Sequence, residues 1–267
     1  MAFADLKPGG VRDYLDAAKG GELWVFQHIP KTAGSSLATE LSANRRPYRN
    51  LHIGMGDGSL KPEQQREKVV KEFVGDAKAQ SVRSISGHLR FENVEVLRDS
   101  RPDLRLFTFV REPVSRVISE YFYCLSPLHN NPEGFRKAFP TLEHFANSLE
   151  GSNKMAVYVS GRRGIRPEDL VALAFERFDF IGSQKLYGLS FRILSSLLWY
   201  ETQSEAKVRV AETKRGKQSI DPETVRTIRQ NNRADIALFA AVSDVYRSCR
   251  EEIVAELKRR ARARMRA

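Results

Sequence analysis

The sequence contains very little cysteine, because only Cys124 and Cys249 occur among its 267 residues. Two thiols this far apart do not make the disulfide framework of a small secreted domain, and they are typical of free thiols in a reducing compartment. Long apolar runs are also missing, since no stretch approaches the ~18 consecutive apolar residues of a membrane span. Residues 1–21 carry scattered charges and no apolar signal-peptide segment. We therefore expect a cytoplasmic protein.

Several functional signatures are absent as well. No group of histidine, cysteine and carboxylate residues has the spacing of metal ligands, so we expect no metal. The GxxxxGK[ST] loop of nucleotide kinases does not occur. Internal repeats and low-complexity tracts are lacking too. A length of 267 residues with 41% hydrophobic content then predicts one α/β domain over residues 1–267.

Positive charge is abundant, with a formal net charge of +11. The end of the chain, 258–267, supplies +6 of it and contains no acid: its basic residues are Lys258, Arg259, Arg260, Arg262, Arg264 and Arg266. One interpretation is a solvated helix end, where cations are favourable. The other is contact with an anionic surface, such as lipid headgroups, a polyanionic acceptor or nucleic acid. The rest of the positive charge suits a site for an anionic cofactor.

Apolar periodicity predicts strands that alternate with helices. Short apolar runs favour strands at 23–26, 82–86, 104–110 and 178–181. Helical spacing predicts helices at 34–43, 62–73, 113–125, 168–177 and 188–200, one opening at 221–222, and one long helix at 234–258. Residues 45–59 and 126–140 are expected to be loops. This order indicates an α/β fold with a central parallel sheet, whose ligands bind at the carboxyl ends of the strands.

The first of these strand ends runs directly into a helix through Pro30-Lys31-Thr32-Ala33-Gly34-Ser35-Ser36-Leu37. A glycine here lets the backbone approach a ligand, and the first N–H groups of the helix favour an anion. The hydroxyl groups of Thr32, Ser35 and Ser36 would add donors, and Lys31 would add a mobile positive charge. We interpret the segment as a phosphate cradle; the alternative is a capped strand-to-helix turn with an incidental lysine.

A second strand end carries Val110-Arg111-Glu112-Pro113-Val114-Ser115-Arg116-Val117-Ile118-Ser119. Arg111 would end the central strand, while Ser115 and Ser119 would share one face of the next helix. An arginine and a serine that converge there can hold a second phosphate. Arg116 is expected to pair with Glu112 or Glu120 on the surface.

Together, the segments 28–37 and 110–119 resemble the PAPS-dependent sulfotransferases, and most of all the branch of carbohydrate 2-O-sulfotransferases and their bacterial relatives. PAPS is 3′-phosphoadenosine 5′-phosphosulfate. The resemblance implies that Lys31, Thr32, Ala33, Gly34, Ser35 and Ser36 bind its 5′-phosphosulfate. It implies that Arg111 and Ser119 bind its 3′-phosphate, and that the fold is a three-layer, P-loop-like one.

A weaker likeness extends over about residues 23 to 245. It includes segments 153–161 and 178–182, although Lys185 stands where many relatives have a glutamate, so the role of that acid is in doubt. The segment Thr213-Lys214-Arg215-Gly216-Lys217 precedes a helix that ends near Asn232 and Asp235, as in relatives. Lys214, Arg215 and Lys217 are therefore candidates for contact with the 3′-phosphate.

The candidate base lies in Ser86-Gly87-His88-Leu89-Arg90, because a neutral imidazole is a good general base near physiological pH. A histidine in a similar Gly-His context is the catalytic base of the carbohydrate branch. The alternative for His88 is a structural histidine at a strand end. His28 could instead pack against the cradle or orient Lys31, and His52 could reach the substrate.

These expectations combine into one function: transfer of a sulfuryl group from PAPS to a hydroxyl of an acceptor, with His88 and Lys31 catalytic. The resemblance implies a carbohydrate or glycoconjugate acceptor, which basic residues such as Arg45, Arg46, Arg49 and Arg90 would suit if it is an anionic saccharide. Two other functions remain open. One is a nucleotide kinase-like phosphotransferase, and the other is a non-catalytic polyanion-binding protein.

Overall fold

Five parallel strands form the central sheet of the computed structural model, which describes residues 1–53, 60–198 and 220–264. Their order is β2-β3-β1-β4-β5. All four neighbouring pairs are parallel. The strands span Trp24–Gln27 (β1), Tyr48–Asn50 (β2), Ser84–Gly87 (β3), Arg105–Val110 (β4) and Phe180–Ser183 (β5). This arrangement confirms the predicted α/β class with a parallel sheet.

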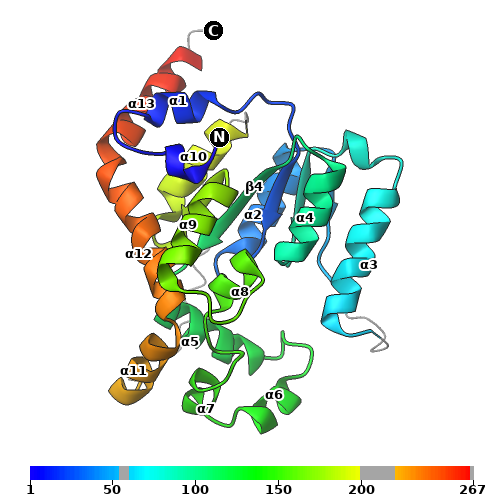
Figure 1. Cartoon of the computed structure of the whole chain (residues 1–267), viewed down its shortest axis with the longest axis vertical. Helices are drawn as coiled ribbons and strands as arrows, with labels where there is room; N and C mark the ends of the chain where they lie inside the picture. The colour runs from blue at the N-terminus through cyan, green and yellow to red at the C-terminus, as the bar shows by residue number, and fades with distance from the viewer. Residues whose placement is uncertain (54–59, 199–219, 265–267) are drawn as a thin grey trace.

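Helices cover both faces of the sheet and make it the middle of three layers. In Figure 1, α4, α8 and α9 lie in front of the strands, and α2 and α10 lie behind them. The helices span Val11–Asp16 (α1), Gly34–Asn44 (α2), Pro62–Gly75 (α3), Phe91–Ser100 (α4), Pro113–Cys124 (α5), Pro132–Ala138 (α6), Leu142–Ala146 (α7), Lys154–Ser160 (α8), Pro167–Arg177 (α9), Tyr187–Leu197 (α10), Pro222–Asn231 (α11), Arg233–Ser248 (α12) and Arg250–Arg264 (α13). No helix in the described ranges is long and apolar enough to cross a bilayer.

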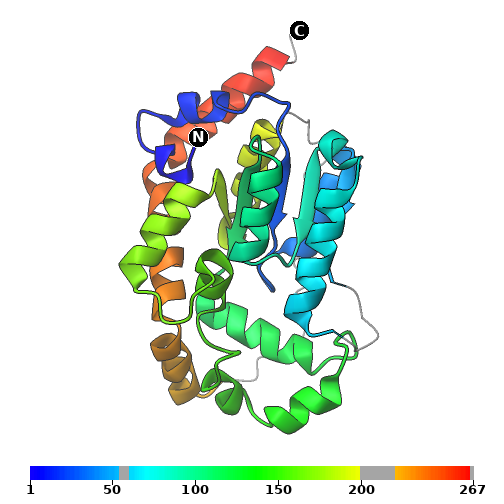
Figure 2. The same ribbon diagram turned by 45° about the vertical axis from the view of Figure 1, so that its right-hand side comes forward.

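Strands β1 and β4, two of the three inner strands, are apolar because both of their faces are covered. Trp24, Val25 and Phe26 of β1 are fully buried, and so are Leu106 and Phe107 of β4. Strands covered on both sides read as continuous apolar runs, as the predicted strands 23–26 and 104–110 do. Because the strands are parallel, the ends of β1, β3 and β4 open on one edge of the sheet. Helices α5, α6, α7 and α11 lie beyond that edge (Figure 1, Figure 2).

Three sequence predictions about elements were wrong. The expected loop 45–59 contains β2, a polar edge strand of three residues that periodicity does not detect. The expected loop 126–140 contains α6, whose first turn is capped by the Asn131 side chain accepting from the Gly134 N–H at 2.9 Å. The expected single helix 234–258 is two helices, α12 and α13, which meet at Cys249.

Two residues cap each other's helices and fix α8 beside the strand ends. The Asn153 Oδ1 atom accepts from the Ala234 and Asp235 N–H groups at the start of α12, at 3.1 and 3.2 Å. In return, the Asp235 carboxylate accepts from Met155 N at 3.1 Å and from Ala156 N at 2.8 Å, at the start of α8. Each cap satisfies N–H groups that a helix start leaves without partners. Helix α8 therefore holds its place relative to α12 through this pair.

Replacing Asn153 with alanine should weaken the fold. Asn153 has a left-handed backbone (φ 43°), which alanine disfavours, and the two α12 caps would be lost as well. The expected loss in the free energy of unfolding is about 2 kcal/mol. Urea unfolding measures it, with Asn147→Ala as the matched control because Asn147 is exposed. Equal losses in the two variants would contradict the role of the caps.

Candidate active site

The loop between β1 and α2 has the backbone of an anion site. Lys31 (φ 68°) and Ala33 (φ 90°) are both left-handed, although neither is glycine. Such residues cost of order 1–3 kcal/mol each and cluster at ligand clamps. Alternating left- and right-handed residues turn successive N–H groups toward one point, and α2 starts there without a side-chain cap. The predicted cradle therefore has donors for a phosphate or sulfate group.

The hydroxyl groups of the cradle differ in what they can reach. Ser35 and Ser36 are exposed in the first turn of α2, as a contact with phosphate requires. Thr32 is fully buried, and its Oγ1 donates to the Ile29 carbonyl at 2.8 Å. The predicted Thr32 hydroxyl donor is therefore wrong for this conformation, because that hydroxyl closes the turn. Only the Thr32 backbone remains to face a ligand.

Arg111 connects the two predicted anion pockets. Its Nη1 donates to the carbonyl of Lys31 at 3.1 Å, so the strand-end arginine and the cradle are in direct contact. The Lys31 Nζ lies 4.0 Å from the centroid of the Tyr123 ring near the end of α5. Burial and the Arg111 charge lower the pKa of Lys31, so the two cations are close enough to affect each other's surroundings. Ser119 is half-buried on the same helix, α5.

His88 has one ring nitrogen available for chemistry. Its Nδ1 lies 2.8 Å from the His28 carbonyl, and because a carbonyl only accepts, Nδ1 carries the proton. Nε2 then holds the lone pair that a general base needs. The fully buried Gln27 side chain fixes the residue after His88, because its Nε2 donates to the Leu89 carbonyl at 3.1 Å. The same Nε2 donates to the Tyr158 carbonyl of α8 at 2.7 Å. Sequence analysis missed Gln27, although a glutamine that ends an apolar strand is a usable signal.

The electrostatics of His88 favour its neutral form. Burial is the largest cause that lowers its pKa, and the charges of Arg66 and Lys154 lower it further. The hydrogen bond to the His28 carbonyl and the Glu120 charge act in the opposite direction without outweighing them. The lowered pKa therefore favours a neutral His88 imidazole at neutral pH, with its one proton on Nδ1.

Two more histidines surround His88. The His28 ring stacks on the His88 ring with centroids 4.2 Å apart, and His28 Nδ1 lies 3.0 Å from His52 Nε2. One ring nitrogen from each of the three histidines lies within 4.8 Å of the other two. Three nitrogens this close together are enough ligands to bind a metal ion. However, the His28 and His88 planes differ by only 27°, so their lone pairs do not converge on one point as they stand. The absence of a metal stays a prediction.

Gly34 has a different role from the one that its sequence context indicated. A Cβ atom built on Gly34 would lie 1.7 Å from His28 Nε2, so the His28 ring occupies the space of the missing side chain. The glycine was expected to admit a ligand to the backbone. In the structure it admits His28, which seats a histidine ring against the first turn of α2.

Buried charges support the floor of the site. Arg116 Nη1 donates to Glu120 at 2.6 Å, and Lys154 Nζ at the start of α8 also pairs with Glu120. Burial raises the pKa of Glu120, but Arg116 and Lys154 outweigh burial and hold it below its usual value. The predicted Arg116–Glu120 pair is confirmed, but its surface location is wrong, because the Arg116 side chain is fully buried. Sequence analysis did not single out Lys154 or Tyr123.

Some predicted residues are not brought into the site. Lys214, Arg215 and Lys217 lie outside the described residues, so their contact with the 3′-phosphate stays a prediction. Arg45 donates to the carbonyls of Gly20 and Leu198 at 2.7 and 3.2 Å and serves the fold. Arg49 pairs with Asp76 at 2.8 Å. These two arginines are therefore not available to an acceptor in this conformation.

Among solved structures, the chain is similar to the crystal structure of mouse sulfotransferase SULT7A1 complexed with PAP, with 12% identity over 86% of this chain and 72% of that chain and a TM-score of 0.37. A likeness of that size carries no weight by itself. No curated protein matches the sequence. The profile described as "Sulfotransferase family" matches residues 22–178, more than half of the chain and all of the site described above, so the protein belongs to the sulfotransferase family.

Proposed function

We propose that the protein transfers the sulfuryl group of PAPS directly to a hydroxyl group of a carbohydrate or glycoconjugate, with His88 as the general base. The observation that supports this proposal is the contact between Arg111 and the Lys31 carbonyl at 3.1 Å, because it joins the two segments that carry the predicted anion pockets. PAPS has a 5′-phosphosulfate and a 3′-phosphate on one nucleoside, so it needs two such pockets.

The binding roles follow from the chemistry of each pocket. The N–H groups at the start of α2, with Ser35 and Ser36, suit the 5′-phosphosulfate. Arg111 and Ser119 suit the 3′-phosphate, since a guanidinium binds phosphate by two parallel hydrogen bonds. Lys31 can leave the Tyr123 ring for the phosphosulfate, because an exposed cation–π contact is worth only about 0.5–1 kcal/mol.

Transfer can proceed in line between two oxygens. As the acceptor oxygen attacks sulfur, His88 Nε2 takes its proton, and the bond between sulfur and the bridging oxygen breaks. PAP leaves with the electron pair, and Lys31 and the α2 N–H groups stabilise the charge on the departing oxygen. No enzyme nucleophile is required, and burial raises the pKa of the nearby Cys124 thiol to about 11, which keeps that thiol protonated.

An anionic saccharide is the acceptor that the charges near the base favour. The positive charges of Arg66 and Lys154 both act on His88. Arg90 lies two residues after His88, with its guanidinium carbon 5.8 Å from the centroid of the Tyr158 ring of α8. Acids such as Glu63 and Glu120 offset part of this charge.

Radiolabelled PAPS offered to neutral and acidic saccharides should label the acidic ones faster, and no labelling of any hydroxyl acceptor would contradict the proposed function.

Removing the base should slow transfer without affecting the nucleotide site. A general base contributes typically about 10²–10⁴-fold, so His88→Ala is expected to lower kcat by that factor. PAP affinity should change little, because Lys31 and Arg111 remain. Steady-state kinetics and calorimetry measure the two effects, with the exposed His144→Ala as the control. A His88→Ala enzyme with normal kcat would contradict the assignment of the base.

The pH dependence should reflect the lowered pKa of His88. The unprotonated form is the active one, so activity is expected above this pKa and is lost below it. Since burial, Arg66 and Lys154 hold the pKa of His88 below 6.5, the acid limb of kcat/KM should have its midpoint below pH 6.5. His28 and His52, packed on His88, have lowered pKa values, which favour their neutral forms at neutral pH. An acid limb with its midpoint above pH 7 would contradict this prediction.

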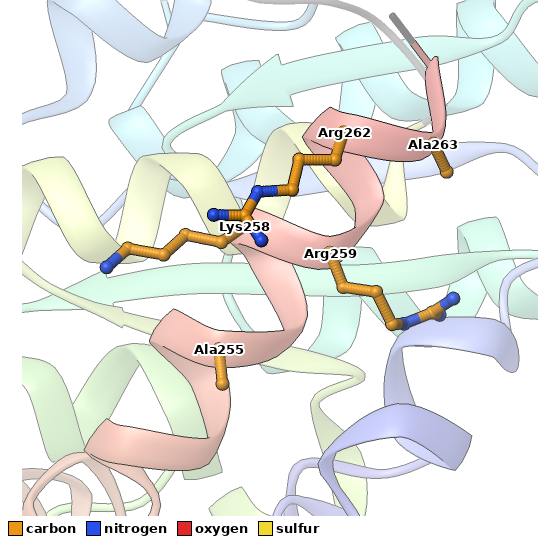
Figure 3. Close-up of a pocket in the computed structure, with 5 residues that line it drawn as sticks. All are labelled: Ala255, Lys258, Arg259, Arg262 and Ala263. Carbon is orange, nitrogen blue, oxygen red and sulfur yellow. The ribbon is translucent and has the colours of Figure 1, made fainter. Parts of the chain in front are cut away.

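We also propose a contact of the α13 end with anionic surfaces. Lys258, Arg259 and Arg262 project from the outer side of α13 around a shallow hollow (Figure 3). Arg259 and Arg260 pair with Glu256 at 2.6 and 3.0 Å, which leaves Lys258 and Arg262 as the better candidates. The double variant Lys258→Glu/Arg262→Glu should reduce co-sedimentation with phosphatidylserine vesicles at low salt, and unchanged sedimentation would contradict the contact.

A cytoplasmic location is proposed on the two free cysteines.

A further inference from the structure

His28 lies between the two functional parts of the site. It directly follows β1, three residues before Lys31, and its backbone touches the segment of His88 on both sides. The His28 N–H donates to the Gly87 carbonyl at 2.9 Å, and the His28 carbonyl accepts from His88 Nδ1 at 2.8 Å. The residue is therefore fixed to the base through its main chain.

The His28 ring is enclosed on every side. It stacks on Phe26 at 5.2 Å and on His88 at 4.2 Å between centroids. Its Nε2 edge lies against Gly34, where even a methyl group would collide at 1.7 Å. Its Nδ1 edge faces His52. A ring held this tightly between the first turn of α2 and the base moves only if one of them moves.

A chain of hydrogen bonds fixes the protons on these rings. The Asn50 Oδ1 atom accepts from the His52 backbone N–H at 3.0 Å, which identifies it as the oxygen, and it lies 2.5 Å from His52 Nδ1. His52 Nδ1 therefore carries a proton, and His52 Nε2 accepts from His28 Nδ1–H. The His28 Nε2 lone pair is consequently the edge that lies beside the helix start.

We propose that His28 is a positioning residue that couples the phosphosulfate cradle to the base, because its ring packs between the first turn of α2 and the His88 ring. The Asn50–His52 pair keeps the His28 ring in the required orientation. This inference rests on the proposed function, because it takes His88 as the base and the cradle as the PAP site. It adds that the base is aligned by a loaded nucleotide site.

Nuclear magnetic resonance of ¹⁵N-histidine-labelled full-length protein tests the coupling without an acceptor. Long-range ¹H–¹⁵N spectra report the tautomer of each ring. In the wild type, saturation with PAP should shift the His88 ring resonances. In His28→Ala the shift should fall to less than about a third, because ring-to-ring contact is lost. The exposed His144→Ala serves as control and should respond as the wild type does.

A second variant covers the case in which His28→Ala does not fold. Asn50 is exposed on the edge strand, and Asn50→Ala removes the oxygen that accepts from both the His52 ring and the His52 backbone N–H. Its His52 and His28 rings should lose their single tautomer, and the His88 response to PAP should at least halve. A full His88 response in either variant would overturn the inference, as would ring signals that change when EDTA strips a bound metal. Failure of the wild type to bind PAP would instead overturn the proposed function.

Discussion

The hydrogen bond between Arg111 and the Lys31 carbonyl is the contact on which the site depends. It joins the end of β4 to the loop after β1, and these strands are neighbours in the sheet. The parallel sheet therefore brings two segments about 80 residues apart in sequence to one place. Without this junction, the two segments would lie apart, and the proposal of one bisphosphorylated nucleotide bound by both would lose its support.

Electrostatics explain why the site holds so many cations without disrupting the fold. Burial and the Arg111 charge lower the pKa of Lys31, and an incoming anion would favour its charged form. Beneath them, Glu120 accepts from Arg116 and Lys154, so the deepest charges are already paired. Unpaired buried charge would be costly. Lys31 and Arg111 are therefore the cations that remain for an anionic ligand, because Arg116 and Lys154 already pair with Glu120.

Much of the site could be predicted from the sequence, because its motifs are local. Arg111 directly follows β4, and Lys31 to Ser36 lie in the short turn between β1 and α2 and in the first residues of α2, where a strand-to-helix connection has few conformations. The rest depends on contacts across the sheet. Three features could not be predicted because they depend on contacts in the folded chain. Gly34 leaves space for the His28 ring, the Thr32 hydroxyl turns inward, and Gln27 binds the segment after His88. Strand β2 escaped prediction because three polar edge residues carry no periodic signal.

Calorimetric titration of PAP and 5′-AMP tests the central claim most directly, because the two nucleotides differ only in the 3′-phosphate. The wild type should bind PAP more tightly, and Arg111→Ala should lose about tenfold or more of PAP affinity while 5′-AMP affinity changes little, since one charged pairing of this kind is worth about 1.5–3 kcal/mol. Equal losses for both nucleotides, or a wild type that does not distinguish them, would contradict a single nucleotide held by Lys31 and Arg111.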